Sequence, residues 1–211
     1  MNDADAAAVL EALQPPEPEQ PIEVLKPETE KKAEIQIVDG QMQFTSIDQV
    51  WRLADAISQS GLAPDSFRNK QQIFIVLLRA MELKIGPFQA LEGMMVIRGK
   101  IGMTVDLALA MVQASGRLKE CSTIHEGEGD EFKAVVTLQR KGRKANTYSF
   151  SVAQAKRAML WGKPGPWTQY SERMLRYRAL GFGLRDEFPD ILRGIKTAEE
   201  LQDYPEPNHK S

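Results

Sequence analysis

Five stretches of the chain have the apolar pattern and the boundary residues of helices. Ser46 precedes the first stretch and Gly61 follows it, and helices prefer serine at the N-cap and glycine after the C-cap. Pro164 and Pro166 separate the last two stretches, because proline interrupts a helix. We therefore predict helices over residues 46–61, 69–84, 104–116 or 106–116, 152–160 and 167–185.

Strand patterns occupy the remaining positions between residues 94 and 150. The apolar runs 94–97 and 101–104 flank Arg98-Gly99-Lys100, which is typical of a tight turn, so we expect a hairpin there. Three more segments have strand composition, and their short linkers favour antiparallel pairing in a meander. These segments are residues 117–124, 131–138 and 145–150. The expected fold class is α+β, an antiparallel β-meander and hairpin packed with helices.

The composition excludes several classes of protein. With 211 residues, the chain is long enough for one domain with tails. One cysteine and two histidines rule out a disulfide framework and a Cys-rich or His-rich metal site. No run of 18 apolar residues occurs, and the N-terminus is acidic where a signal peptide would be basic. We therefore expect a soluble, cytoplasmic protein with no membrane partner.

The net charge of −2 conceals an uneven distribution of charge along the chain. Residues 1–40 have ten acids and three bases, and residues 197–211 have four acids and one base. The intervening residues 41–196 have 15 acids and 23 bases, which is a net charge of +8. A basic body of this kind either binds a polyanion or is a solvated surface, and charge alone does not distinguish the two.

The first 43 residues are predicted to form a disordered acidic arm. Five prolines fall between Pro15 and Pro27 among Glu, Gln and Lys, and such a composition buries too little apolar surface to fold. We favour a solubility role for the arm; the alternative is that it competes with an anionic ligand for the basic body. One folded domain is expected over residues 44–200, and a short tail over residues 201–211.

No set of residues defines a catalytic site. Cys121 lies in a predicted strand, where a free cysteine is usually part of the core. Asp186, Glu187 and Asp190 are close in sequence, but no second acidic cluster completes a two-metal site. The segment 93–101 departs from an ATP-binding phosphate loop in its glycine spacing and lacks a hydroxyl residue after the lysine. We expect no catalysis, no cofactor and no metal.

The strongest chemical signal lies in residues 156–185, where seven bases stand against one acid. Aromatic residues are interleaved with these bases. Cationic side chains bind the phosphates of a nucleic acid, and aromatic side chains stack on its nucleobases. This composition is therefore typical of a site for single-stranded nucleic acid. Two basic turns, 98–100 and 140–144, are expected to add to it. The candidate DNA-binding residues are Arg98, Lys100, Arg140, Lys141, Arg143, Lys144, Lys156, Arg157, Lys163, Trp167, Arg173, Arg176 and Arg178.

Two alternatives stay open within this stretch. Trp167, Met174 and Phe182 fall on one side of the predicted helix, which is also typical of core packing. Arg178 projects within that apolar arc, so it either extends its charge to solvent, pairs with an acid or lines a groove. The basic turn 140–144 is either a solvated turn or the second wall of a groove.

Residues 165–179 (GPWTQYSERMLRYRA) resemble the conserved helix of phage single-strand annealing proteins of the RecT/Redβ superfamily. Residues 83–88 and 96–105 resemble the step and the hairpin upstream of it, so that the resemblance covers about residues 44–200. It implies an α+β domain that holds single-stranded DNA in a basic groove, with Glu172 as a departure from the pattern. The resemblance assigns to this groove Lys100, Lys156, Lys163, Arg173, Arg176 and Arg178.

The same resemblance implies ATP-independent annealing of complementary strands in phage recombination, without enzymatic bond chemistry. The expected partners are single-stranded DNA, the annealed duplex intermediate and further copies of the chain in a ring or helical filament. A phage 5′-3′ exonuclease and a host single-strand-binding protein are also expected partners, in the cytoplasm of a bacterial host. The alternative is a non-annealing protein that binds duplex DNA or has a regulatory role. A metal-dependent nuclease is the third hypothesis.

Overall fold

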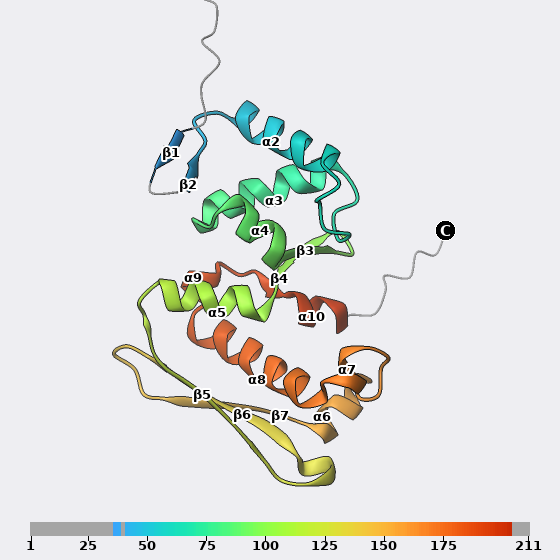
Figure 1. The fold of residues 1–211 in the computed structure, drawn as a ribbon. Coiled ribbons are helices and arrows are strands. Elements are labelled where there is room, and N and C mark those ends of the chain that lie inside the picture. Colours follow the sequence, from blue (N-terminus) through green and yellow to red (C-terminus); the bar gives the residue numbers. More distant parts are fainter. Residues whose placement is uncertain (1–35, 39–40, 204–211) are drawn as a thin grey trace, which may run out of the picture. The chain divides into compact units, whose positions relative to one another are not determined.

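The computed structural model of the protein describes residues 36–38 and 41–203. Helices and antiparallel sheets are both present, so the fold class is α+β as predicted (Figure 1). The N-terminal elements are β1 (Gln36–Val38), β2 (Gln41–Gln43), α2 (Ile47–Gln59), α3 (Lys70–Leu83) and α4 (Pro87–Gly93). The middle elements are β3 (Met94–Ile97), β4 (Lys100–Met103), α5 (Val105–Ala114), β5 (Leu118–Glu126), the 3₁₀ helix η1 (Gly129–Glu131), β6 (Lys133–Arg140) and β7 (Asn146–Ser151). The C-terminal elements are α6 (Val152–Arg157), α7 (Pro166–Gln169), α8 (Ser171–Glu187), α9 (Pro189–Leu192), β8 (Lys196–Thr197) and α10 (Ala198–Asp203).

The first predicted helix is confirmed as α2. The Ser46 hydroxyl accepts a hydrogen bond from the Gln49 backbone N–H, and the Gln49 side chain accepts one from the Ser46 N–H, which completes a capping box. Helix α2 packs against α3, where Trp51 meets Phe74 edge to face at a centroid distance of 5.0 Å.

The predicted arm boundary at residue 43 differs from the structure. Strands β1 and β2 form an antiparallel pair before that boundary, with Ile37 opposite Met42. Each strand has three residues, too few for an alternating pattern to be visible in a Pro-rich and Glu-rich context. The rest of the predicted arm, residues 1–35 and 39–40, and residues 204–211 of the predicted tail lie outside the described residues.

The predicted hairpin is confirmed as β3–β4, with Val96 opposite Ile101. A third strand, β8, pairs with β4 in parallel, and we did not predict it because two residues show no alternation. Helix α10 covers this sheet at Gly102. A Cβ atom on Gly102 would lie 2.7 Å from Leu201 Cδ1, so glycine permits the close approach.

The predicted meander is confirmed as the antiparallel sheet β5–β6–β7. Ala134, Val136 and Leu138 alternate along β6 and are fully buried on one face, and α8 packs against β6 and β7. The helix comes close because residue 183 is glycine. A Cβ atom there would lie 2.7 Å from both Leu138 Cδ1 and Tyr148 Cδ2.

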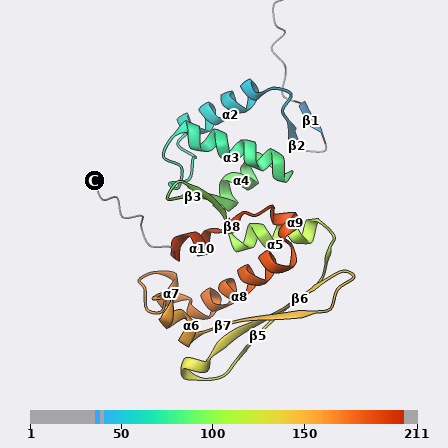
Figure 2. The same ribbon diagram turned by 180° about the vertical axis from the view of Figure 1, so that it is seen from behind.

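On its other side α8 contacts α5 and α10, so this helix lies between the meander sheet and a layer of helices (Figures 1 and 2). Its apolar residues therefore face more than one direction, as Leu175, Ala179 and Leu184 are all fully buried. Among the described residues, no helix is both long enough and apolar enough to cross a membrane.

Candidate nucleic-acid interface

The helix that we predicted over residues 167–185 is two helices in the structure, α7 and α8, which meet at Tyr170. Because α8 is enclosed by other elements, it does not present its length to solvent as the floor of an open groove. The basic residues of this helix therefore divide into buried and exposed groups, and each group has a different chemical capacity.

Arg178 belongs to the buried group, with an exposed fraction of 3%. Its guanidinium pairs with the Asp203 carboxylate of α10, Nη1 lying 2.8 Å from Oδ2 and Nη2 2.8 Å from Oδ1. Burial lowers the pKa of Arg178, which the charges of Asp203, Glu199 and Glu200 partly offset. Of the outcomes that we left open for Arg178, pairing with an acid is the one that the structure has.

Trp167 lies beneath Arg178 and is also buried, at 7% exposed. The guanidinium carbon of Arg178 is 5.8 Å from the centroid of the indole ring, which is within cation–π range. We predicted both residues to contact DNA. Their burial and mutual packing instead give them a structural role, in which they tie α7 and α10 to α8.

Arg140 is a second predicted DNA contact that the fold uses internally. It is 9% exposed, and its two terminal nitrogens donate to the two carboxylate oxygens of Asp190 at 2.6 and 2.7 Å. One of these nitrogens also donates to the Glu187 backbone carbonyl at 2.8 Å. This bidentate bond holds the pKa of Asp190 at about 2, well below its usual value. Arg140 thereby fastens the end of β6 to the C-terminal end of α8.

Glu187 extends the same network. Its carboxylate accepts hydrogen bonds from the Tyr148 hydroxyl at 2.8 Å and from the side-chain amide of Asn146. Burial and the Glu187 carboxylate raise the pKa of Tyr148. The Asp186–Glu187–Asp190 cluster, which we considered for a metal, thus has two of its three carboxylates bonded to protein donors. Within the residues that the structure describes, no group of His, Cys, Asp and Glu could hold a metal ion.

The remaining candidates of α8, Arg173 and Arg176, lie nearer its N-terminal end. Arg173 is largely exposed; its Nε donates to the Tyr177 hydroxyl at 2.8 Å, and Tyr177 donates to Asp106 at 2.8 Å. These contacts raise the pKa of Arg173, whose guanidinium keeps its charge and its access to solvent. Arg176 lies over the Tyr177 ring, 5.9 Å from the centroid, and is partly exposed.

The basic residues of α6 and of the loop after it are exposed. Lys156 pairs with Asp130 of η1, and Arg157 and Lys163 complete this set. Among the described residues, no salt bridge is formed by Arg157 or Lys163. Burial raises the pKa of the partly buried Asp203, and the charges of Arg178 and Lys163 partly offset this shift. Lys163 is therefore close to the end of α10.

The β3–β4 turn reaches the same place. Arg98 and Lys100 are exposed, and Arg98 donates from Nη1 to the Leu201 carbonyl of α10 at 3.3 Å. Contacts thus run from this turn to α10, and from α10 through Arg178 to Trp167 of α7. Figures 1 and 2 both show the β3 turn, α10 and α7 at one side of the molecule. We call this region the cationic edge, which comprises Arg98, Lys100, Arg157, Lys163 and Arg173.

The β6–β7 turn lies elsewhere. Lys141, Arg143 and Lys144 are exposed, but the turn adjoins the C-terminal end of α8 through Arg140, whereas the cationic edge adjoins the N-terminal end. Glu187, which Arg140 contacts, follows Arg173 by 14 residues along α8, which is about 21 Å at 1.5 Å per residue. The turn therefore does not adjoin Arg173.

Three exposed apolar residues next to the cationic edge are not among our candidate DNA-binding residues, although Trp161 and Tyr170 belong to the aromatic residues interleaved with the basic ones in residues 156–185. Met159, Trp161 and Tyr170 are 79%, 37% and 64% exposed, and they flank α7 on both sides. Their exposure follows from irregular backbone, with Met159 at φ 55° and Gly165 at φ 99°, which a helical projection cannot represent. The dense Gly and Pro content of residues 162–166 was the available signal that a helical face does not continue here.

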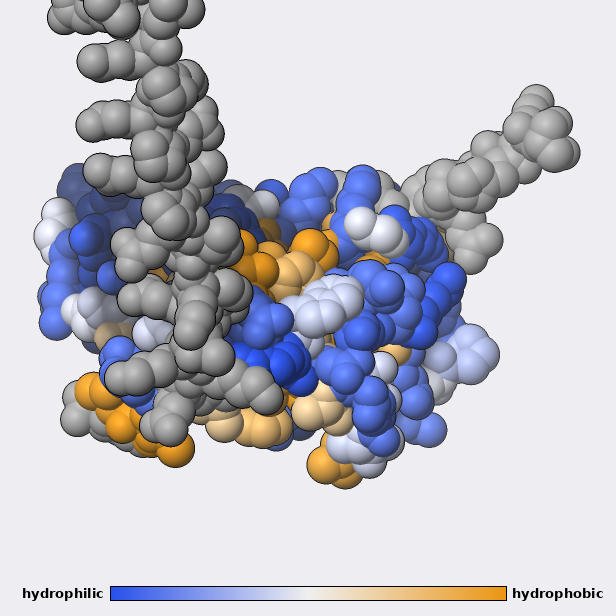
Figure 3. All heavy atoms as spheres, turned by 90° about the horizontal axis from the view of Figure 1, so that it is seen from above, coloured by the Kyte–Doolittle hydropathy of each residue, from blue (hydrophilic) through white to orange (hydrophobic). Residues whose placement is uncertain are grey.

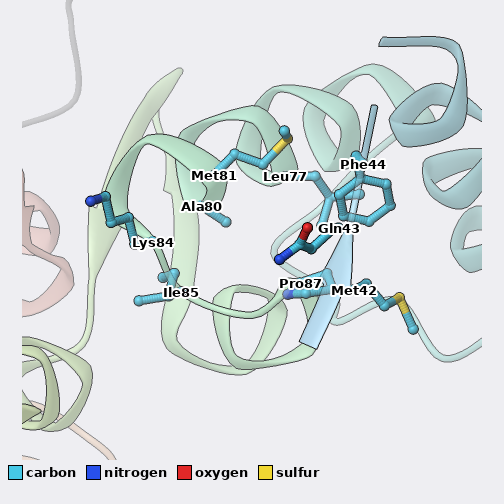
Figure 4. A pocket seen from close by; sticks show the side chains of 9 residues that line it. All are labelled: Met42, Gln43, Phe44, Leu77, Ala80, Met81, Lys84, Ile85 and Pro87. Carbon is cyan, nitrogen blue, oxygen red and sulfur yellow. The ribbon is translucent and has the colours of Figure 1, made fainter. Parts of the chain in front are cut away.

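A separate pocket of about 360 Å³ lies between β2, α3 and α4 (Figure 4). Phe44, Leu77 and Met81 line it, together with Met42, Gln43, Ala80, Lys84, Ile85 and Pro87. Figure 3 shows apolar side chains that reach the surface among hydrophilic ones on the face seen from above. Few polar side chains are there to orient a ligand, since Gln43 and Lys84 alone carry them among the lining residues.

In comparisons with protein-family models, curated proteins and solved structures, none matched this chain. The resemblance of residues 165–179 to annealing proteins therefore stays a prediction from those residues.

Proposed function

We propose that this protein binds single-stranded DNA and anneals complementary strands without ATP. The observation that carries the proposal is the cationic edge, whose exposed cations come from the β3–β4 turn, from the end of α6 with the loop after it, and from the first turn of α8; Arg98 and Lys163 of this set lie next to α10. Exposed cations from separate elements are suited to an extended polyanion, because each can neutralise a different phosphate. The resemblance to the RecT/Redβ superfamily supplies the specific activity, annealing.

Annealing requires no bond chemistry, which agrees with a sequence in which no set of residues defines a catalytic site. The barrier is electrostatic, since two polyanions must approach each other with their bases accessible. A surface that neutralises the phosphates of one strand and leaves base edges open lowers this barrier, and duplex stacking of about 1.4 kcal/mol per step then drives pairing.

The wider setting is part of the same proposal. Many copies of the chain would assemble in a ring or a helical filament. The modest affinity of each copy for DNA would then combine into tight binding of one strand. We further propose that the protein acts in the cytoplasm of a bacterial host, together with a phage exonuclease and a host single-strand-binding protein.

The test is annealing of two complementary labelled oligonucleotides with no nucleotide and no divalent metal. The protein is expected to accelerate pairing, and the double variant Arg157→Ala/Lys163→Ala is expected to lose much of this effect. The slope of log affinity for single strands against log salt should become shallower by about 0.7 for each phosphate that the variant no longer neutralises. Arg52→Ala is the matched control, because Arg52 is a partly exposed cation on α2 that pairs with Asp48. Preferential binding of duplex DNA, or no acceleration by the unaltered protein, would reject the proposal.

A further inference from the structure

The surface around α7 exposes flat apolar rings beside exposed cations. In the loop before α7, Leu160 is 2% exposed and anchors the loop in the core, whereas its neighbours Met159 and Trp161 are 79% and 37% exposed. The loop is thus held by one buried side chain and turns the two adjacent side chains outward. The outward side chains do not contribute to core packing, because Leu160 is the one residue of these three that is buried in the core.

Tyr170 continues this surface on the other side of α7. Trp167 is buried under Arg178, but Tyr170, three residues later, is 64% exposed. The Tyr170 side chain makes no hydrogen bond and no ring contact within the part of the chain that the structure describes. It borders a shallow hollow of about 370 Å³ that Gln169, Ser171, Glu172 and Arg173 also line. The exposed ring therefore has room for a flat partner.

The charge around the two rings indicates the chemistry of that partner. Arg157 and Lys163 flank the loop of Trp161, and Arg173 shares the hollow with Tyr170. A ligand that satisfies both features is a polyanion with flat, unpaired rings, which describes single-stranded nucleic acid. Duplex DNA satisfies only the charges, because its bases are stacked on each other inside the helix.

We propose that Trp161 and Tyr170 stack on unpaired bases and so give this protein its preference for single strands over duplex. This inference rests on the proposed binding of single-stranded DNA and names the residues that read the bases. The cations of the edge bind the phosphates of any nucleic acid. The two aromatic rings strengthen the binding only of strands whose nucleobases are accessible.

The experiment compares an oligothymidine with an abasic oligonucleotide of the same length, which has the phosphates and sugars but no bases. The unaltered protein is expected to bind the oligothymidine more tightly. Tyr170→Leu and Trp161→Leu should each weaken oligothymidine binding by about fivefold or more and leave abasic binding and the salt slope unchanged. Tyr170→Phe, which keeps the ring, is the matched control and should bind as the unaltered protein does. Circular dichroism would verify that the leucine variants fold.

The outcomes separate this inference from the proposed function. Equal affinity for the two oligonucleotides would overturn the stacking proposal and leave single-strand binding intact. Equal loss of both affinities in the leucine variants would also overturn it, because the rings would then support the fold or the phosphate contacts. Binding to neither oligonucleotide would reject both proposals. Binding of anionic lipid vesicles that Trp161→Leu abolishes, without effect on oligothymidine, would assign the rings to a membrane surface and overturn the proposal.

Discussion

At the C-terminal end of α8, Arg140 is bonded to both oxygens of Asp190 and to the Glu187 carbonyl, and it is almost fully buried. At the N-terminal end, Arg173 is mostly exposed and Tyr170 beside it has no hydrogen-bond or ring partner in the described residues. Both ends are rich in charge and aromatic groups. The end whose buried arginine is bonded to a carboxylate and a backbone carbonyl stabilises the fold, and the end whose groups stay exposed is available for a ligand.

The largest expected effect lies at the C-terminal end. Arg140→Met keeps an apolar stem but removes the donors to Asp190 and to the Glu187 carbonyl, which leaves a buried acceptor without a partner. We expect the free energy of unfolding to fall by about 2–3 kcal/mol, below the range for fully buried pairs because Asp190 is half exposed. Denaturant unfolding measures it. Lys141→Met, the exposed neighbour, should change stability by less than about 0.5 kcal/mol, and an equal effect of both variants would contradict the structural role of Arg140.

A second, smaller effect concerns acid stability at the same end. The pKa of Asp190 is about 2 in the folded protein and near 3.8 without its partners, so its contribution is present above pH 3.8 and is lost as the pH falls towards 2. Asp190→Asn removes this titration. Thermal unfolding between about pH 4 and pH 2 should therefore decline less steeply in the variant than in the unaltered protein. Parallel declines would show that the Arg140–Asp190 bond does not persist in solution.

The smallest expected effect lies at the N-terminal end. Glu172 is exposed on the first turn of α8, next to Arg173, and places a negative charge in the region that we assign to phosphates. Glu172→Lys should tighten single-strand binding several-fold and steepen the salt slope by about 0.7, at a cost of a few tenths of a kcal/mol in stability from the helix dipole. Asp186→Lys, an exposed acid near the opposite end of α8, is the control and should have little effect. Equal tightening by both variants would indicate a general charge effect.

Much of the fold was predictable because periodic patterns are local. Ser46 marks the start of α2, the alternation along β6 identifies its buried face, and short linkers determine the meander. The pairing of β8 with β4 was not predictable, since it joins two residues to a strand about 95 positions earlier and depends on contacts rather than on pattern.

For the candidate site, the sequence composition indicated the region of the chain but not which of its residues are exposed. The excess of bases in residues 156–185 pointed to the correct part of the chain for exposed cations, yet it included Arg178, whose partner Asp203 is distant in sequence. Arg140 was misassigned for the same reason, because its partner Asp190 lies 50 residues away. Whether an arginine faces an acid or solvent is decided by tertiary packing, and a single sequence does not contain that information.

The parallel pairing of β4 with β8 bears on how the chain folds during synthesis. The sheet that contains β3 and β4 stays incomplete until Lys196 and Thr197 leave the ribosome, and Leu201 must follow before Gly102 is covered. The α2–α3 pair and the meander have mainly local contacts and can form earlier, whereas closure of this small sheet is a long-range event. A nascent chain stalled before residue 196 should therefore be protease-sensitive around residues 94–103 and become protected once α10 emerges.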